Sequence, residues 1–258
     1  MIDENAQVIS NEPLGESLYL IRLASEGIAG DVEPGQFVHM GIPTLQSHIL
    51  RRPFSIYDAD TDLGTIDILY QVVGTGTAEM VEWREGQKTR LLGPIGNRWH
   101  APEDAKRALI VGGGVGAAPL FMLTKELLAQ GIHVDAVLGA STSNALVCRD
   151  RYASICFDSA YFATDDGSCG AHGFATVHVE DLLKRDASYD YAAICGPEPF
   201  MKAASSMTLA EGIPTQVSLE KRMACGLGAC LSCVCDTVDG RKRVCVDGPI
   251  FDARKVVW

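Results

Sequence analysis

The chain has 258 residues, enough for one large domain or two to three small ones, and 47% of them are hydrophobic, as in soluble globular proteins. A formal net charge of −11 argues against nucleic acid or an anionic membrane surface as partner. No window holds the roughly 18 apolar residues of a membrane span, and the acidic N-terminus lacks the features of a signal peptide. We therefore expect a cytoplasmic protein, whose nine cysteines indicate metal ligation or redox chemistry rather than disulfides.

Residues 1–102 are expected to form a β barrel. Residues 17–24 and 65–74 alternate apolar and polar side chains with period two, which is typical of half-buried strands. Residues 33–42 and 86–96 are short apolar runs bounded by Gly and Pro turns. Several short strands at this spacing predict a small barrel.

Residues 103–215 are expected to form an α/β domain with a parallel sheet. Residues 106–131 contain an apolar strand, a glycine loop and a helix that ends at Gly131. The sequence then predicts strands at 133–141 and 152–164, a short helix at 179–185, and a strand, turn and helix over 189–212. Such alternation of strands and helices is typical of a parallel sheet.

Five cysteines lie in the third region, residues 216–258. Cys225, Cys230 and Cys233 are spaced C-x4-C-x2-C, and Cys245 follows after eleven intervening residues. This is the plant-type ferredoxin spacing for a [2Fe–2S] cluster. Each tetrahedral iron then takes two sulfides and two cysteines. The glycines of the CGLGAC segment allow the loop to wrap around a cluster with its amides aimed at sulfur.

Alternatives to the cluster are a zinc site and unrelated buried thiols. A structural zinc site prefers two C-x2-C pairs, and this region has one. The region also carries seven Lys and Arg against five Asp and Glu, a surplus of +2 that would offset the net −2 of an oxidised cluster. The plant-type pattern does not need Cys235. We treat Cys148, Cys156, Cys169 and Cys235 as structural.

A one-electron cluster beside a two-electron cofactor suggests a flavin, which exchanges both hydrides and single electrons. In the run LRRPFSIYD, Arg52 offers a guanidinium for a pyrophosphate and Ser55 a hydroxyl within reach of an isoalloxazine edge. An ordinary edge strand is the alternative. Further on, LYQVVGTGT is a strand that runs into a Gly-Thr-Gly-Thr loop, whose amides can approach phosphates closely. Tyr70 suits either ring stacking or a place in the core.

The glycine loop of the second domain is a candidate nucleotide site. Gly112, Gly114 and Ala117 match G-x-G-x-x-A, but no acidic residue closes the next strand, since Asp135 lies early in it. The match to the dinucleotide motif is therefore partial. Cys195 and the following Gly-Pro stand at the end of another strand, where ligand crevices of parallel sheets lie.

The motifs RPFS, VGGGVGAAPL, TDDGSCG and CGPEPFM, in this order, are similar to those of the ferredoxin–NADP reductase superfamily. With CGLGACLSC and the last cysteine attached, the whole chain resembles the electron-transfer subunits of class 1B, NAD-dependent dihydroorotate dehydrogenases. The resemblance implies an FAD-binding β barrel (1–102), an NAD-binding α/β domain (103–215) and a small [2Fe–2S] domain (216–258). It implies FAD contacts at Arg52, Pro53, Phe54, Ser55, Leu69, Tyr70, Gln71, Gly76 and Thr77; NAD contacts at Gly112, Gly113, Gly114, Gly116, Cys195 and Gly196; and cluster ligands at Cys225, Cys230, Cys233 and Cys245.

The resemblance also implies a partner and a role in pyrimidine biosynthesis. In that family an FMN-containing (β/α)8 subunit oxidises dihydroorotate, and electrons pass through the cluster and FAD to NAD in a heterotetramer with two of each subunit. In the similar subunits of bifurcating reductases the first cluster ligand is typically aspartate, whereas residue 225 here is cysteine. The segment after residue 141 has no Lys or Arg before Arg149, which favours NAD over NADP. The alternative is a self-contained NAD(P)H-dependent reductase that serves a ferredoxin or another soluble acceptor.

Overall fold

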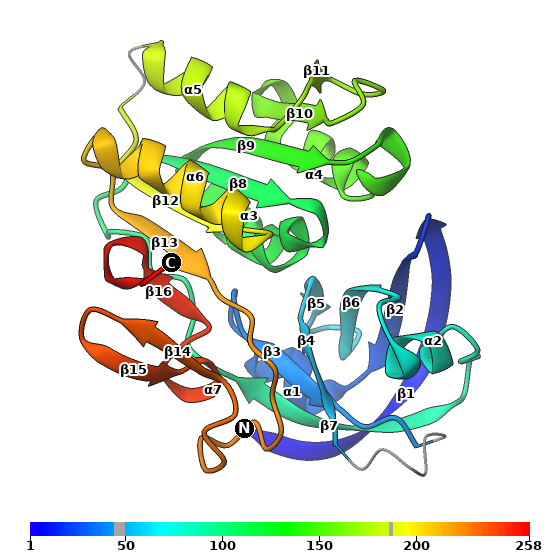
Figure 1. Cartoon of the computed structure of the whole chain (residues 1–258). Coiled ribbons are helices and arrows are strands. Elements are labelled where there is room, and N and C mark those ends of the chain that lie inside the picture. The colour runs from blue at the N-terminus through cyan, green and yellow to red at the C-terminus, as the bar shows by residue number, and fades with distance from the viewer. Residues whose placement is uncertain (44–49, 186–187) are drawn as a thin grey trace.

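The computed structural model describes residues 1–43, 50–185 and 188–258. Figure 1 shows two sheet regions, one above the other, with the C-terminal segment lying along the same side of both. Within the described residues there are two seven-stranded sheets and one two-stranded sheet. No helix of this described part is long and apolar enough to cross a membrane.

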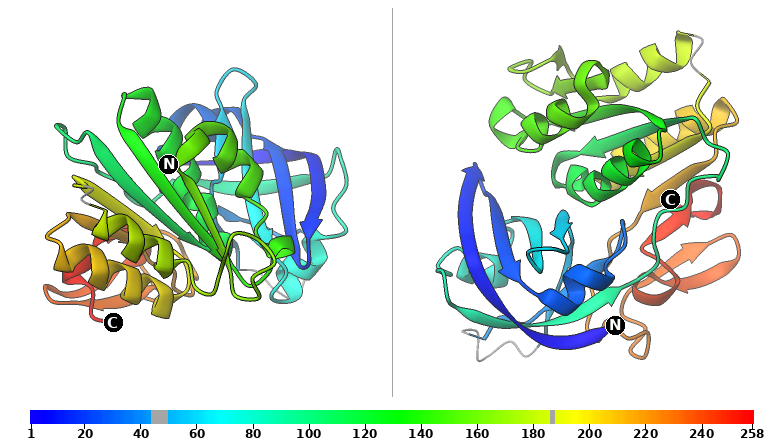
Figure 2. Two further views of the ribbon diagram at one scale, coloured as in Figure 1. Left: turned by 90° about the horizontal axis from the view of Figure 1, so that it is seen from above. Right: turned by 180° about the vertical axis from the view of Figure 1, so that it is seen from behind.

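The N-terminal sheet is antiparallel, with the order β4-β3-β7-β1-β2-β6-β5, and curls as the barrel prediction requires. The long β1 pairs with both β2 and β7, and from behind it forms a curved arm around the sheet (Figure 2). Strand β7 alternates exposed and buried side chains. The prediction of a half-buried strand at residues 65–74 is wrong, because β6 is buried along almost its whole length. The elements are β1 (Ile2–Gly15), β2 (Leu18–Ala24), α1 (Glu26–Asp31), β3 (Phe37–Met40), β4 (Arg52–Ser55), β5 (Asp58–Asp60), β6 (Thr65–Gln71), α2 (Thr75–Met80) and β7 (Lys88–Ile95).

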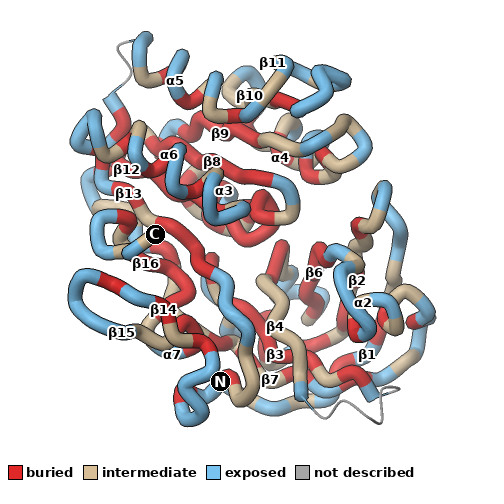
Figure 3. The backbone as a smooth tube through the Cα atoms, viewed as in Figure 1, coloured by how far each residue is buried: buried red, intermediate tan, exposed pale blue. Residues whose placement is uncertain are grey.

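The second sheet has the order β11-β10-β9-β8-β12-β13-β16, and its first six strands are parallel. Helices cover both faces: α3 and α4 contribute to one core, and α5 and α6 to another. The central strands β8, β9 and β12 are therefore mostly apolar and mostly buried (red in Figure 3). The elements are β8 (Arg107–Gly113), α3 (Ala118–Ala129), β9 (His133–Ala140), α4 (Arg149–Cys156), β10 (Ala160–Thr164), β11 (Ala171–His172), α5 (Thr176–Lys184), β12 (Tyr191–Cys195), α6 (Glu198–Ala210), β13 (Thr215–Ser218) and β16 (Ile250–Asp252).

One sequence prediction in this domain is wrong. Residues 152–164 were expected to be strand throughout, but the helix α4 takes residues up to Cys156, and the strand β10 begins only at Ala160. Tyr152 and Cys156 are four residues apart, so both face the core from one side of a helix. The Tyr152 hydroxyl donates to the carbonyl of Ala117 at 2.8 Å, which ties α4 to the glycine loop.

The C-terminal segment is joined to the parallel sheet. Strands β14 (Val234–Thr237) and β15 (Gly240–Arg243) form a hairpin, α7 (Val244–Asp247) follows, and β16 pairs antiparallel with β13. Strand β13 runs across the predicted boundary at 215/216. The division into regions 1–102, 103–215 and 216–258 stays a prediction.

Candidate functional site

A cavity of about 470 Å³ lies between the antiparallel sheet and the start of α3. We call it the β4 cavity, because all four residues of β4 line it. The opposite wall comes from the glycine loop and the first turn of α3. The structure brings all nine residues expected to contact FAD into the lining of this one cavity: Arg52, Pro53, Phe54, Ser55, Leu69, Tyr70, Gln71, Gly76 and Thr77.

The phosphate-binding end expected of this cavity is built from Arg52 and the start of α2. A Cβ on Gly76 would lie 3.3 Å from Arg52 Nε, so the bare backbone of α2 lies against the guanidinium. Thr77 Oγ1 accepts hydrogen bonds from the amides of Val73 (2.9 Å) and Gly74 (3.2 Å) and donates to the Gly74 carbonyl. These bonds fix the turn at the start of α2, which lines the cavity together with Arg52.

Tyr70 takes the place in the core that the sequence allowed, while stacking on a flavin ring stays a prediction. Its ring is buried and stacks on Tyr19 with the centroids 5.5 Å apart, while Phe54 meets it edge-on at 6.3 Å. Its hydroxyl donates to Asn11 Oδ1 at 3.1 Å, and burial raises its pKa to about 12. Tyr70 is thus a fixed, neutral wall of the cavity.

The glycine loop follows β8, at the point where the chain leaves for β9 on one side and later returns to β12 on the other. Ligands of such sheets bind at this switch point, beyond the carboxyl ends of the strands. Gly113 and Gly114 line a second cavity of about 470 Å³, which we call the glycine cavity. It also contains the ends of β9 and β10 and the start of α6.

Four other residues of the predicted nucleotide site act through packing in this structure. A Cβ on Gly116 would lie 2.6 Å from the Gly196 amide nitrogen, so the loops after β8 and β12 meet backbone to backbone. Gly112 packs under Ala117, where a Cβ would lie 2.8 Å from its Cα. Cys195 is buried, and burial holds the pKa of its thiol well above the usual range. None of Gly112, Gly116, Cys195 and Gly196 lines the described cavities.

Glu220 is a site residue that sequence reasoning missed. It lines the β4 cavity and a neighbouring cavity of about 770 Å³, and desolvation raises the pKa of its carboxyl. Its charge also acts on Cys195, which lies on the adjacent strand. The signal was present, because Glu220 comes two residues after β13, at the same carboxyl edge as the glycine loop.

The neighbouring cavity links β4 to the cysteine-rich segment. It shares Arg52–Ser55, Val73 and Glu220 with the β4 cavity and reaches Met223, Ala224 and Ser232. Strand β4 therefore has the glycine loop on one side and the cysteine loop, residues 225–233, on the other.

The cluster cysteines lie as two interacting pairs. The sulfur of Cys225 accepts a hydrogen bond from the Leu227 amide at 3.3 Å and is also hydrogen-bonded by Cys230, and these hydrogen bonds lower the pKa of Cys225 to about 6. Cys233 accepts from the amide of Cys245 at 3.5 Å, and burial and the neighbouring thiol raise the pKa of Cys245 to about 11.

The backbone of the cysteine loop has the conformation that a wrapped cluster requires. Gly226, Gly228 and Leu231 have φ values of 69°, 78° and 58°, which turn the chain and point its amides inward. Within residues 1–43, 50–185 and 188–258, no three His, Cys, Asp or Glu side chains are arranged around one ion. A single zinc needs such a set, whereas each iron of a [2Fe–2S] cluster takes only two cysteines. Two thiol pairs fit the cluster better.

The family follows from the comparisons with known proteins. Residues 220–257 match the iron-sulfur cluster binding domain of dihydroorotate dehydrogenase B. The chain is 39% identical over 261 residues to the "Dihydroorotate dehydrogenase B (NAD(+)), electron transfer subunit" of Geobacillus thermodenitrificans, covering 98% of both chains. The chain belongs to the family of dihydroorotate dehydrogenase B electron transfer subunits. The member from Fusobacterium nucleatum is 34% identical, again over 98% of both chains.

Solved structures confirm the predicted ferredoxin reductase-like fold. A chain of the NADH-dependent reduced ferredoxin-NADP oxidoreductase superposes with a TM-score of 0.89 at 30% identity, covering 98% of this chain and 89% of that one. A ferredoxin NADP+ reductase from Neisseria gonorrhoeae with bound FAD and NADP superposes with a TM-score of 0.69 at 18% identity, covering 81% of this chain and 92% of that one. The latter likeness concerns the fold alone.

The remaining cysteines lie apart from the cysteine loop or inside a core. Burial raises the pKa of Cys148 and of Cys156 to about 12. Cys169 accepts a hydrogen bond from Arg149 at 3.7 Å. Cys235 is buried on β14, and its place outside the ligand set stays a prediction from the cysteine spacing.

Proposed function

We propose that this electron transfer subunit binds FAD in the β4 cavity, the nicotinamide nucleotide at the glycine cavity, and a [2Fe–2S] cluster on Cys225, Cys230, Cys233 and Cys245. One observation carries the proposal. Strand β4 lines both the cavity that meets the glycine loop and the cavity that reaches the cysteine loop. A flavin held on β4 would thereby face both the glycine loop and the cysteine loop.

When bound, FAD exchanges a hydride with NAD and single electrons with an iron–sulfur cluster. The residues of this chain would bind FAD and orient its ring system. Arg52 and the amides at Gly76 and Thr77 offer positive charge and donors for a pyrophosphate. Phe54 and Tyr70 offer apolar surface for the ring system. Ser55 and Glu220, which face the same cavity, supply the polar side chains beside it.

The glycine cavity favours NAD over NADP. Its one charged lining residue among those described is Asp165, which follows β10. A carboxylate repels a 2′-phosphate and can accept hydrogen bonds from a ribose. This agrees with the lack of Lys and Arg between residues 141 and 148.

The electron donor is a catalytic subunit of dihydroorotate dehydrogenase, as the family implies. We propose that this partner carries FMN, that two copies of each chain assemble, and that the complex works in the cytoplasm. Cys230 of the cysteine loop is exposed, so the partner subunit would approach the cluster from this side.

Anaerobic co-expression with the dihydroorotate dehydrogenase catalytic subunit proposed as the partner tests this assignment. We expect a complex with two copies of each chain that reduces NAD when dihydroorotate is added. The isolated chain should not oxidise dihydroorotate. Purification as a lone chain that passes electrons from NADH to ferredoxin, with no affinity for a dihydroorotate-oxidising subunit, would instead support a self-contained reductase.

A further inference from the structure

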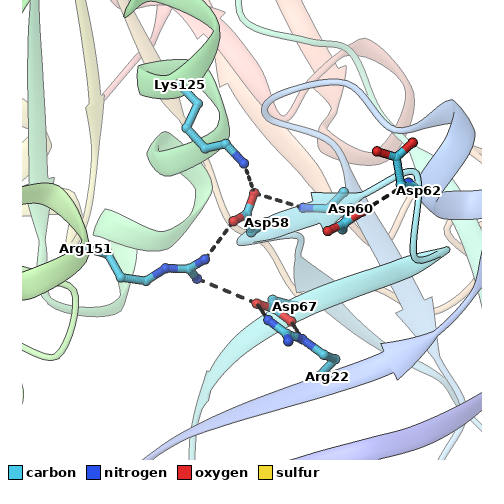
Figure 4. Close-up of polar contacts among 8 residues, drawn as sticks. Arg22, Asp58, Asp60, Asp62, Asp67, Lys125 and Arg151 are labelled. Carbon is cyan, nitrogen blue, oxygen red and sulfur yellow. Dashed lines mark hydrogen bonds and ion pairs between the residues drawn. The ribbon is translucent and has the colours of Figure 1, made fainter. Parts of the chain in front are cut away.

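Arg151 of α4 reaches from the parallel-sheet domain to two strands of the antiparallel sheet (Figure 4). Its Nη2 lies 2.7 Å from Asp58 Oδ2 on β5, and its Nη1 lies 3.6 Å from Asp67 Oδ2 on β6. Lys125 of α3 reaches the other oxygen of Asp58 at 2.7 Å. Arg22 binds Asp67 through both carboxylate oxygens, at 2.7 and 2.8 Å. One guanidinium thus joins two domains through two carboxylates.

The guanidinium of Arg151 is also held between aromatic rings. Its Cζ lies 4.6 Å from the centroid of Tyr57 and 4.7 Å from that of Phe121, and these rings contact each other at 5.1 Å. The side chains of Asp58 and Asp67 are only 13% and 5% exposed. Such partly desolvated, stacked and paired geometry suits a planar arginine and not a lysine.

Each contact of Arg151 adjoins one wall of the β4 cavity. Asp58 follows Ser55 by three residues, and Asp67 precedes Leu69 by two. Phe121 lies one helical turn after Ala118, which lines the cavity from the start of α3. The position of α3 relative to β4 and β6 therefore depends on the place of this guanidinium.

We propose that Arg151 is a positioning residue for hydride transfer: by holding α3 and the glycine loop against β4 and β6, it sets the distance between the nicotinamide and the flavin. The inference rests on the proposed function. It adds a residue that touches neither cofactor site and that sequence motifs do not reveal. Hydride transfer is sensitive to such placement, because a 1 Å error in the position of reacting groups can cost about 100-fold in rate.

Two variants of the cofactor-loaded chain test the role of Arg151. Arg151→Met keeps an apolar stem over the rings but removes the positive charge, and Asp58→Asn removes the negative charge on β5. Flavin reduction is followed by anaerobic stopped-flow absorbance at saturating NADH, together with the long-wavelength charge-transfer absorbance of the flavin–nicotinamide pair. We expect both variants to reduce flavin at least ~10-fold more slowly, with weaker charge-transfer absorbance and a Kd for NADH within about twofold of wild type.

Lys125→Met is the matched control. Lys125 shares Asp58 with Arg151, but it does not reach Asp67 and lies farther from the Phe121 ring, at 5.9 Å. We expect its rate to stay within about twofold of wild type. Arg151→Lys keeps the positive charge but not the planar guanidinium. Its rate of flavin reduction should lie between those of wild type and Arg151→Met.

Equal rates and equal charge-transfer absorbance in wild type and either variant would overturn the role of Arg151. If both variants lose FAD, Arg151→Lys decides, because it keeps the charge but not the planar fork. The rate at saturating NADH should fall in this variant, and an unchanged rate would overturn the proposal. A wild-type chain whose flavin NADH does not reduce would instead count against the proposed function itself.

Discussion

Gly226 of the cysteine loop packs directly against His39 of β3: a Cβ on this glycine would lie 2.9 Å from the imidazole Nδ1. His39 is buried, and desolvation, with the charges of Arg51 and Arg52, lowers its pKa. On its other side β3 pairs His39 with Pro53 of β4. The residue next to the first expected cluster ligand thus lies one strand away from the expected flavin site.

The four-cysteine assignment predicts which thiols iron needs. Cys233→Ala should abolish the [2Fe–2S] absorbance and the EPR signal of the reduced chain, because Cys233 and Cys245 form one of the two thiol pairs. Cys235→Ala should keep both signals and about two irons per chain. Iron analysis and EPR of anaerobically prepared protein check this. A full cluster in Cys233→Ala, or its loss in Cys235→Ala, would show that the ligand set is wrong.

Neighbouring arginines provide a matched test of the FAD site. Arg52→Ala should weaken FAD binding about 10- to 100-fold, since a charged hydrogen bond to a phosphate contributes roughly 1.5–3 kcal/mol. Arg51→Ala should leave the affinity for FAD near that of wild type, because Arg51 binds Asp3 at 2.9 Å and lines neither cavity of β4. Fluorescence titration of the flavin-free chain measures both values. Equal losses in the two variants would refute the assignment of Arg52.

Because the loops after β8 and β12 are in backbone contact, we expect a single methyl group added at Gly116 to lower both stability and NADH affinity. In Gly116→Ala the new Cβ would lie 2.6–2.7 Å from backbone atoms of Cys195 and Gly196, which cannot move away singly. We expect a loss of about 1–3 kcal/mol in the free energy of unfolding and about tenfold weaker NADH binding. Gly30→Ala, where no heavy atom lies within 4 Å, is the control. An unchanged NADH affinity in Gly116→Ala would show that this contact does not contribute to nucleotide binding.

Glu220 predicts a pH dependence of stability. Because desolvation raises its pKa in the folded chain, the folded state holds this proton to higher pH than the unfolded state does. Its contribution is fully present below the ordinary pKa near 4.5 and is lost as the pH rises through the folded value. Glu220→Gln should therefore gain Tm relative to wild type as the pH rises through this window, whereas exposed Glu85→Gln should not. Parallel Tm curves for wild type and Glu220→Gln would contradict this.

Much of the fold and the site could be predicted from the sequence, because local patterns record it. Period-two alternation located β2, glycine-rich strand ends located the loops after β8 and β12, and cysteine spacing located two thiol pairs that lie together in space. The nine residues that the family resemblance implies around FAD come from three segments, and they line one cavity.

The rest depends on contacts between distant segments. Strand β16 joins β13 because the C-terminal segment folds back on the parallel sheet, and no periodicity records that pairing. Residues 152–156 are apolar enough for a strand, but Tyr152 and Cys156 pack as one side of a helix. Arg151 and Asp58 are 93 residues apart, so their ion pair has no signature in the sequence.

Anaerobic titration of the purified chain with NADH, followed by visible absorbance, tests the central claim most directly. The account predicts that the flavin band and the broader iron–sulfur absorbance both bleach, because β4 lines both the cavity that meets the glycine loop and the cavity that reaches the cysteine loop. Bleaching of a flavin with no iron–sulfur component in a chain that holds iron would contradict the arrangement. A colourless chain that holds zinc would contradict both cofactor assignments.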